Sequence, residues 1–174
     1  MKMRKLHKGQ RGFTLIEMIV VLVLVGLISA GITAAIMQVL TINHRASNHM
    51  IAVRQVQQAG KEVSKDTLQA QGVNATGSQG FPLTLTWDEW GTNYTNLIVY
   101  DLVDTPGEGG ELQRSYTING TDPTVIRIAQ YLDPDQTSCS WNNVTLTFTV
   151  TATVGNGPYE AIETRIYEIE PRPD

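Results

Sequence analysis

The residue that most needs a chemical partner in this sequence is Glu17, the single charge in an apolar run from Phe13 to Leu40. A run of this length is typical of a membrane-spanning helix, because about 20 apolar residues cover a hydrocarbon core of about 30 Å. A carboxylate in lipid is costly, roughly 2.5–3.5 kcal/mol at the bilayer centre. We therefore expect Glu17 to meet a positive charge, and a short basic segment ending at Gly12 precedes the run.

Residues suited to catalysis are scarce elsewhere in the chain. The sequence contains no phosphate-binding loop, no Gly-X-Ser-X-Gly nucleophile motif and no zinc-protease motif. His7 lies in the basic segment, and His44 and His49 fall in a region of helical periodicity, where a solvent-facing or subunit-facing role is expected. The sequence therefore predicts a protein that is not an enzyme, has no catalytic residues and needs no cofactor.

Two acidic groups contain the oxygen ligands that calcium prefers, namely Asp133-Pro134-Asp135 and the set Asp101, Asp104 and Glu108. Neither group has the spacing of a known calcium loop, so we interpret them as solvated turn carboxylates and predict no metal site. Cys139 is the single cysteine, which excludes a disulfide within the chain. We expect an unreactive thiol, in a loop or half-buried, and not a disulfide between chains.

Other surface features have equally plain interpretations. Four Asn-X-Thr triplets match the glycosylation pattern, but such matches arise freely in a chain rich in Asn and Thr; they begin at Asn74, Asn93, Asn119 and Asn143. The three tryptophans, Trp87, Trp90 and Trp141, could line a sugar or partner surface, although core packing is the default for tryptophan.

The segment Arg11-Gly12-Phe13-Thr14-Leu15-Ile16-Glu17, with the basic leader before it and the apolar run after it, resembles the processing site of type IV prepilins and pseudopilins. The resemblance implies that prepilin peptidase cuts after Gly12 and methylates the new amino group of Phe13. It also implies that Glu17 neutralises this amino group on an adjacent subunit during assembly. The implied partners are other pilin or pseudopilin subunits, the peptidase, an inner-membrane assembly platform and membrane lipid.

Two simpler explanations of residues 1–40 are a secretory signal peptide and a plain membrane anchor. A signal peptide has an apolar region of only 7–15 residues followed by a small-residue cleavage site, and this run is about twice as long. A plain anchor would not need Glu17. Within the run, Gly26 and Gly31 are candidates for close helix contacts during assembly, although glycine is also simply common in membrane helices.

The charge pattern favours one orientation and excludes one class of partner. The leader holds five basic residues and no acid, so the remaining chain has eight basic and seventeen acidic residues. This acidic balance argues against nucleic-acid binding. The basic leader places the N-terminus in the cytoplasm and the C-terminal region outside the membrane, in a single-pass arrangement.

The remaining chain is expected to hold one long helix followed by a sheet. Apolar residues from Ile42 to Val63 recur at spacings of three and four, which predicts that an amphipathic helix continues to Gln71; the expected inner face is Ile42, Ala46, Met50, Val53, Val56, Gly60 and Val63, and the expected outer face is Arg54, Lys61, Glu62, Lys65 and Asp66. Gly72 is the predicted stop, and residues 72–80 are predicted to form a loop.

Short strands separated by turns predict an antiparallel sheet. Alternation indicates 83–87 and 144–154, an apolar run indicates a central strand at 96–104, and turn signals delimit 111–118, 124–132 and 163–169. The expected organisation is a leader over residues 1–12, a membrane and assembly half of the helix over 13–40, an amphipathic half over 41–71 and a β-rich domain over 72–174. This α+β layout is similar to that of pilins, and most to J-type minor pseudopilins and minor pilins.

Two functions compete at this point. The first is a structural, minor subunit of a type IV pilus, a competence pilus or a type II secretion pseudopilus, which joins a filament after processing at the membrane. The second is a monomeric, membrane-anchored extracytoplasmic binding domain. Processing separates them, because only a prepilin needs Gly12 and Glu17.

Overall fold

The computed structural model describes residues 12–91, 94–105, 107 and 109–172. The chain divides into two compact units, Met1–Thr41 and Ile42–Asp174, which we call the N-terminal unit and the sheet unit. The helices and strands are α1 (Leu15–Thr67), β1 (Gly72–Ala75), η1 (Ser78–Gly80), β2 (Leu83–Asp88), β3 (Thr95–Thr105), β4 (Gly109–Ile118), β5 (Thr124–Leu132), β6 (Ser138–Trp141), β7 (Leu146–Val154), η2 (Gly157–Tyr159) and β8 (Ala161–Ile169). The predicted α+β fold class, a long N-terminal helix with an antiparallel sheet, is confirmed.

The N-terminal unit contains the first part of α1. Its sequence has no proline and is rich in Leu, Ile, Val, Met and Ala, so nothing interrupts the helical hydrogen bonds. All of its described residues before Thr41 are exposed. By length and composition α1 is apolar enough to cross a membrane, and its most apolar window has no buried residue.

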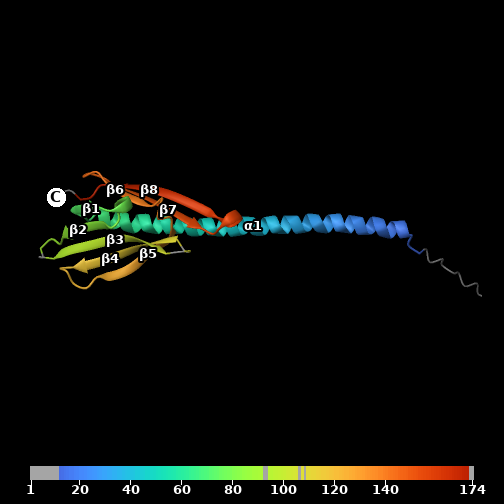
Figure 1. Cartoon of the computed structure of the whole chain (residues 1–174), viewed down its shortest axis with the longest axis horizontal. Coiled ribbons are helices and arrows are strands. Elements are labelled where there is room, and N and C mark those ends of the chain that lie inside the picture. Colours follow the sequence, from blue (N-terminus) through green and yellow to red (C-terminus); the bar gives the residue numbers. More distant parts are fainter. Residues whose placement is uncertain (1–11, 92–93, 106, 108, 173–174) are drawn as a thin grey trace, which may run out of the picture. The chain divides into compact units, whose positions relative to one another are not determined.

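The second part of α1 belongs to the sheet unit and buries one side against the strands (Figure 1). The buried residues are Ala52, Val56, Ala59, Gly60, Val63, Asp66 and Thr67. The predicted inner face is therefore right from Val56 onward and wrong at Ile42, Ala46 and Met50, which are exposed, while Val53 is half-buried. These three residues precede the part of α1 that packs in the core, which begins at Ala52.

Asp66 is the clearest error in the predicted helix faces. It was expected on the outer face with Lys61 and Lys65, but its residue exposure is only 2%. The spacings Ala59, Val63, Asp66 continue the buried face by four and three residues. Residue type alone predicts a solvent-exposed carboxylate at Asp66, whereas in the structure this carboxylate is buried and has buried partners.

The helix ends four residues earlier than predicted, at Thr67 rather than Gln71. The amides of Gln69 and Ala70 bond to the carbonyls of Asp66 and Thr67, each at 3.1 Å, which closes the helix with tight turns. The Gln71 amide then bonds to the Thr86 carbonyl at 2.9 Å. The chain enters the sheet at this point, so β1 replaces the predicted loop over residues 72–75.

The strands form one antiparallel sheet with the order β1-β2-β3-β4-β5-β7-β6, and β8 pairs with the other edge of β7. Figure 1 shows β2 to β5 on one side of the second part of α1 and β6 to β8 on the other. The strands β5 and β7 pair only at Leu132 and Ala152, so the sheet bends there around the helix. Strand β6 was missed by sequence reasoning because its four residues, Ser-Cys-Ser-Trp, are too short to show an alternating pattern.

The core lies between the helix and the inner faces of the strands. Its largest fully buried side chains include Tyr100, Phe148, Leu83 and Leu112, from four different strands. Strand β7 supplies alternate apolar residues to this core, as predicted. Val144, placed at the start of that strand by its sequence, lies before it and is exposed.

Candidate functional site

The residues expected at the processing site lie just before α1. Gly12, Phe13 and Thr14 are not helical, and α1 begins at Leu15. Phe13 is 77% exposed, and nothing lies within 4 Å of the Cβ position of Gly12. The peptide bond between Gly12 and Phe13 is thus in exposed, non-helical backbone, which is the form of chain that a peptidase can bind.

Thr14 determines where the helix begins, and sequence reasoning gave it no role. Its hydroxyl accepts a hydrogen bond from the Glu17 amide at 3.3 Å, and its carbonyl accepts from the Glu17 and Met18 amides at 3.1 and 3.2 Å. These bonds satisfy amides that have no partner within the helix. The signal was present in the sequence, because Thr-X-X-Glu is the pattern of a helix capping box.

Glu17 lies in the first turn of α1, where a negative charge is favoured by the helix dipole. Its side chain is exposed, and no ion pair joins it to another residue of the described chain. The charge that Glu17 needs in an apolar environment is therefore not provided by the described part of the same chain.

Gly26 and Gly31 are also in the N-terminal unit, and nothing lies within 4 Å of either Cβ position. Five residues separate them, which corresponds to about 140° around a helix. The structure therefore places the two glycines on different sides of α1 and does not bring them together. A neighbouring helix that packs closely at Gly26 would therefore not contact Gly31 on the same side of α1.

The sheet unit contains a buried polar cluster that the sequence did not reveal. The Tyr100 hydroxyl donates to Asp66 Oδ2 at 2.5 Å, and Arg114 donates from Nε to Oδ2 at 2.7 Å and from Nη2 to Oδ1 at 3.3 Å. The Arg114 guanidinium lies 5.4 Å from the centre of the Tyr116 ring, whose hydroxyl donates to Asn96 Oδ1 at 2.6 Å. Two strands, β3 and β4, and the end of α1 are thus joined by charged and polar contacts.

The cluster alters the proton affinities of its members. Burial, with the hydrogen bond and the charge of Asp66, raises the pKa of Tyr100 far above its ordinary value. Burial by itself lowers the pKa of Arg114, but the hydrogen bond and charge of Asp66 outweigh burial and raise it. Both residues therefore keep their protons, and the arrangement is suited to holding the helix on the sheet, not to transferring a proton.

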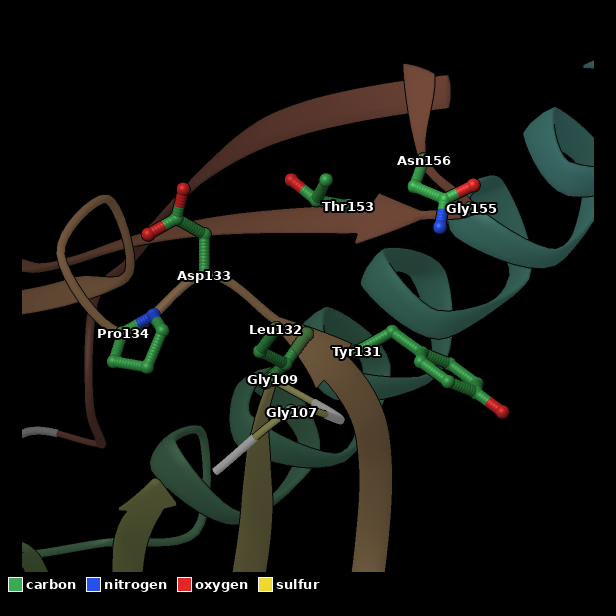
Figure 2. A pocket seen from close by; sticks show the side chains of 9 residues that line it. All are labelled: Gly107, Gly109, Tyr131, Leu132, Asp133, Pro134, Thr153, Gly155 and Asn156. Carbon is green, nitrogen blue, oxygen red and sulfur yellow. The ribbon is translucent and has the colours of Figure 1, made fainter. Parts of the chain in front are cut away.

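A hollow of about 570 Å³ lies beside the end of β5 and the turn after β7 (Figure 2). Among the described residues that line it, Asp133 is the only acidic one. Asp133 Oδ1 accepts from the amides of Asp135 and Gln136 at 3.0 and 3.2 Å, and Oδ2 accepts from Gln136 Nε2 at 2.7 Å. The carboxylate is held by hydrogen bonds within its own turn, and no described histidine, cysteine or lysine lines the hollow beside it.

The calcium groups considered from the sequence are not assembled into a site among the residues that the structure describes. These residues contain no group of three His, Cys, Asp or Glu side chains able to hold a metal. Glu108 lies outside the described residues, as do His7 and Asn93. Asn74, Asn119 and Asn143 are exposed.

The remaining single residues have different surroundings. Cys139 is buried, and burial raises the pKa of its thiol, so the reactive thiolate is disfavoured. The His44 ring lies edge-on to Tyr159, with 5.5 Å between ring centres. Trp87 and Trp141 pack against the core, whereas Trp90 is 96% exposed and departs from the expected core packing.

Comparison with known proteins identifies the N-terminal segment. The family model of the prokaryotic N-terminal methylation motif matches residues 7–33. No curated protein and no solved structure matches the chain significantly. The motif supports a precursor of the type IV pilin or pseudopilin kind, whose families are structural rather than catalytic. It implies processing by prepilin peptidase and assembly with other pilins, and the apolar part of α1 is consistent with membrane anchoring.

Proposed function

We propose that this chain is a minor structural subunit of a type IV pilus, a competence pilus or a type II secretion pseudopilus. The observation that carries the proposal is the arrangement at the start of α1. An exposed Gly-Phe bond is followed at once by a capped helix whose exposed, apolar first part contains one carboxylate. An isolated helix of this kind needs lipid or other helices around it, because exposed apolar area of this size is unfavourable in water.

In this proposal the four segments of the chain have separate tasks. Residues 1–12 are a cytoplasmic leader that is removed, and residues 13–40 hold the chain in the inner membrane and pack in the filament. Residues 41–71 attach the stem to the β-rich domain of residues 72–174, which lies outside the membrane. The strand-rich layout favours a minor subunit of the J type, and the motif match does not bear on that subtype.

Processing would create the partner that Glu17 lacks. Cleavage after Gly12 exposes the amino group of Phe13, which carries a positive charge after methylation. In a bundle of stems, this charge on one subunit pairs with Glu17 of another, which offsets much of the cost of placing either charge alone in an apolar environment. Gly26 and Gly31 would allow close approach of neighbouring stems on two sides of α1.

The N-terminus of the mature chain tests the proposal. Mass spectrometry of protein isolated from membranes is expected to show Phe13 as a methylated N-terminus. Gly12→Val should remain uncut in the membrane, because the peptidase requires a small residue before the cut. Gly26→Val is the matched control, since it adds the same side chain to an exposed glycine away from the cleaved bond and should be processed normally. A mature N-terminus at any other residue would contradict the assignment.

A further inference from the structure

Strand β8 has a free edge. It pairs with β7 over nine consecutive residues, 161–169, without a bulge. Among the described residues, it pairs with no second strand, and no other backbone hydrogen bond is made to the side away from β7. In an antiparallel pair, about half of the residues direct their N–H and C=O groups away from the partner strand. These groups of β8 are therefore left to bond with water or with another chain.

The free edge of β8 has few of the features that prevent a strand from pairing further. Natural edge strands carry bulges, prolines or lysines, and β8 contains none of these. Tyr167 faces α1, so alternation also directs Glu163 and Arg165 inward; these two charges pair with each other at 3.2 Å. On the outer face, Ile162 and Ile166 are 52% and 63% exposed. The edge is thus long, regular and apolar on its outer side, as is suitable for the addition of a strand.

This edge is directed toward the solvent-facing side of α1. The Tyr167 ring occupies the space beside Gly60. Going around the helix from the buried Val63, Gly60 lies at about 60° and Gln57 at about 120°. Lys61 follows at about 160°. The inward side chains of β7 are buried, whereas those in the middle of β8 are only half-buried, so β8 lies at the margin of the core. A strand added to β8 would therefore continue the sheet over Gln57 and toward Lys61.

The side of α1 that this added strand would cover is basic. Arg54, Lys61 and Lys65 lie within about 40° of one another around the helix, and all three are exposed. We call them the basic stripe. None of them belongs to the ion pairs of the described chain, which are all made by arginines on strands. The sheet unit as a whole holds eight basic and sixteen acidic residues, so the basic stripe differs from its surroundings and favours an acidic partner.

We propose that an extended segment of a different filament subunit adds to the free edge of β8, and that apolar and acidic side chains alternate along this segment. Its backbone bonds to the outward N–H and C=O groups of β8. Its outer side chains pack beside Ile162 and Ile166, and its inner side chains pair with the basic stripe. The alternation follows because successive residues of a strand point to opposite faces. The inference rests on the proposed filament function, in which the neighbours of a minor subunit are other chains.

A lipid surface and a second copy of this chain fit the site less well. An anionic membrane attracts the basic stripe but repels the acidic remainder of the unit, and it offers no strand to the edge of β8. A second β8 presents either Glu163 with Arg165, which together have no net charge, or the largely uncharged face of Ile162 and Ile166. Neither face matches the basic stripe. The observations therefore favour an acidic segment of another subunit.

Amide hydrogen exchange tests the added strand in the full-length chain. Sedimentable assemblies from its own membranes are compared with monomers extracted in mild detergent. We expect the outward amides of residues 161–169 to exchange about tenfold more slowly, or slower still, in the assemblies, as amides do when they form stable backbone bonds. Strand β7, which has partners on both sides, should exchange slowly in both samples and shows that the fold is intact. Unchanged exchange in β8 would overturn the proposal.

Carbodiimide cross-linking of the same assemblies identifies the chemistry of the partner. The reagent joins a lysine amine to a carboxylate that touches it. We expect Lys61 or Lys65 to be joined to an acidic residue of a different chain, in a segment where acids alternate with apolar residues. A link between two copies of this chain, or the absence of any link from these lysines to another chain, would overturn the proposal.

Substitution of the outer face of β8 provides a third measurement, with entry into sedimentable assemblies as the readout. The variant I162K+I166K should reduce entry by about fivefold to tenfold, because it removes cross-strand apolar contacts and places lysines on the edge. The matched control V125K+V144K makes the same change at residues that are 54% and 64% exposed outside β8, and it should assemble normally. Thermal melting of both variants verifies that they fold. Full assembly of a folded I162K+I166K variant would contradict the inference.

Reversal of one charge in the basic stripe tests the acidic character of the partner. The variant K61E should reduce assembly by about threefold to fivefold, as expected for the loss of an exposed ion pair and the addition of repulsion. The matched control R45E makes the same change in charge at an exposed residue of α1, which lies about 180° around the helix from Arg54. It should assemble normally. Equal assembly of K61E and R45E would remove the acidic partner from the proposal.

The outcomes separate this inference from the proposed function. All of these variants should be cleaved after Gly12, so absent cleavage in the unaltered chain would remove the filament function itself. Normal cleavage and assembly without slower exchange in β8 would remove only the added strand. Reduced assembly of K61E without slower exchange in β8 would assign the basic stripe to another surface, such as lipid, and would also overturn the proposal.

Discussion

At the scale of single residues, Glu17 and Asp66 are two carboxylates with opposite surroundings. Asp66 is buried and held by Tyr100 and Arg114, whereas Glu17 is exposed on an apolar helix with no ion pair in the described chain. The first is satisfied within the fold. Glu17 needs a partner from outside the described chain. Substitutions of the two carboxylates are therefore expected to have different effects.

Glu17→Val should leave cleavage and membrane insertion intact but reduce entry into filaments. The variant removes the acid and leaves the incoming Phe13 amine unpaired in an apolar bundle, where an unpaired charge costs several kcal/mol. Filament incorporation and processing are measured in parallel with the wild type. Glu62→Val is a control for loss of an acid outside the stem. Equal incorporation of Glu17→Val and wild type would show that charge pairing does not drive assembly.

Asp66→Ala should destabilise the sheet unit by about 3–5 kcal/mol, since it leaves Arg114 and Tyr100 without their shared acceptor in a largely buried position. Thermal or urea unfolding provides the measurement. Glu62→Ala, on the same helix but half-buried and outside the cluster, should change stability by about 0.5 kcal/mol or less. A small effect of Asp66→Ala would mean that the cluster contributes little beyond the apolar core.

At the scale of elements, the packing of α1 on β8 depends on a close approach at Gly60. A Cβ built on Gly60 would lie 2.0 Å from Cζ of Tyr167, and the Tyr167 hydroxyl donates to the Val56 carbonyl at 3.3 Å. The Tyr167 ring also stacks on Phe148, with 6.3 Å between ring centres. The absence of a side chain at Gly60 therefore leaves the space that the Tyr167 ring occupies between α1 and β8.

Gly60→Ala should destabilise the fold by about 1–3 kcal/mol, because the ring must move or the helix must separate from β8. This sign is opposite to the usual effect within a helix, where alanine is favoured over glycine by about 1 kcal/mol. Unfolding of the variant alone and in combination with Tyr167→Val tests the reason, since the smaller side chain should recover part of the loss. A stabilised Gly60→Ala variant would show that Tyr167 adjusts without cost.

At the scale of the whole molecule, the sheet unit should fold without the N-terminal unit. It has its own core, formed by one face of α1 and the inner faces of the strands. A fragment of residues 42–174 is expected to be soluble and to melt cooperatively, as calorimetry or circular dichroism would show. A fragment that aggregates at once or lacks a cooperative transition would mean that the stem contributes to the core.

The same fragment should lose stability in alkali. The folded state raises the pKa of Tyr100 above its ordinary value of 10.0 and that of Cys139 above its ordinary value of 9.0. Above these ordinary pKa values the unfolded chain releases the two protons, whereas the folded chain keeps them. Their contribution is therefore complete below about pH 9 and declines as the pH rises further. Melting temperatures between pH 7 and 11 should fall at the alkaline end.

Tyr100→Phe separates the tyrosine from other alkaline effects. It should be less stable than wild type at pH 7, because a buried hydrogen bond to Asp66 is lost, but its melting temperature should fall less steeply above pH 10. The exposed Tyr131→Phe should keep the wild-type slope. An unchanged slope in Tyr100→Phe would assign the alkaline loss to other groups.

The sequence alone determined the features that depend on local pattern. The continuous apolar run predicted a long, apolar N-terminal helix, since composition is a property of neighbouring residues. The processing site at Gly12 and Phe13 was an implication of the resemblance to prepilins and stays a prediction. Alternation likewise located β2 and β7, and an apolar run located β3. The cap at Thr14 is also a local feature, given by its spacing to Glu17.

Only the tertiary structure decided which residues meet across long separations. Asp66 is buried because Tyr100 and Arg114, 34 and 48 residues away, supply its hydrogen bonds. Strand β1 exists because Gly72 to Ala75 find partners on β2, although their own sequence resembles a loop. Residue type gives the average environment of a side chain, whereas the free energy of a buried charge or a short strand depends on its specific partners.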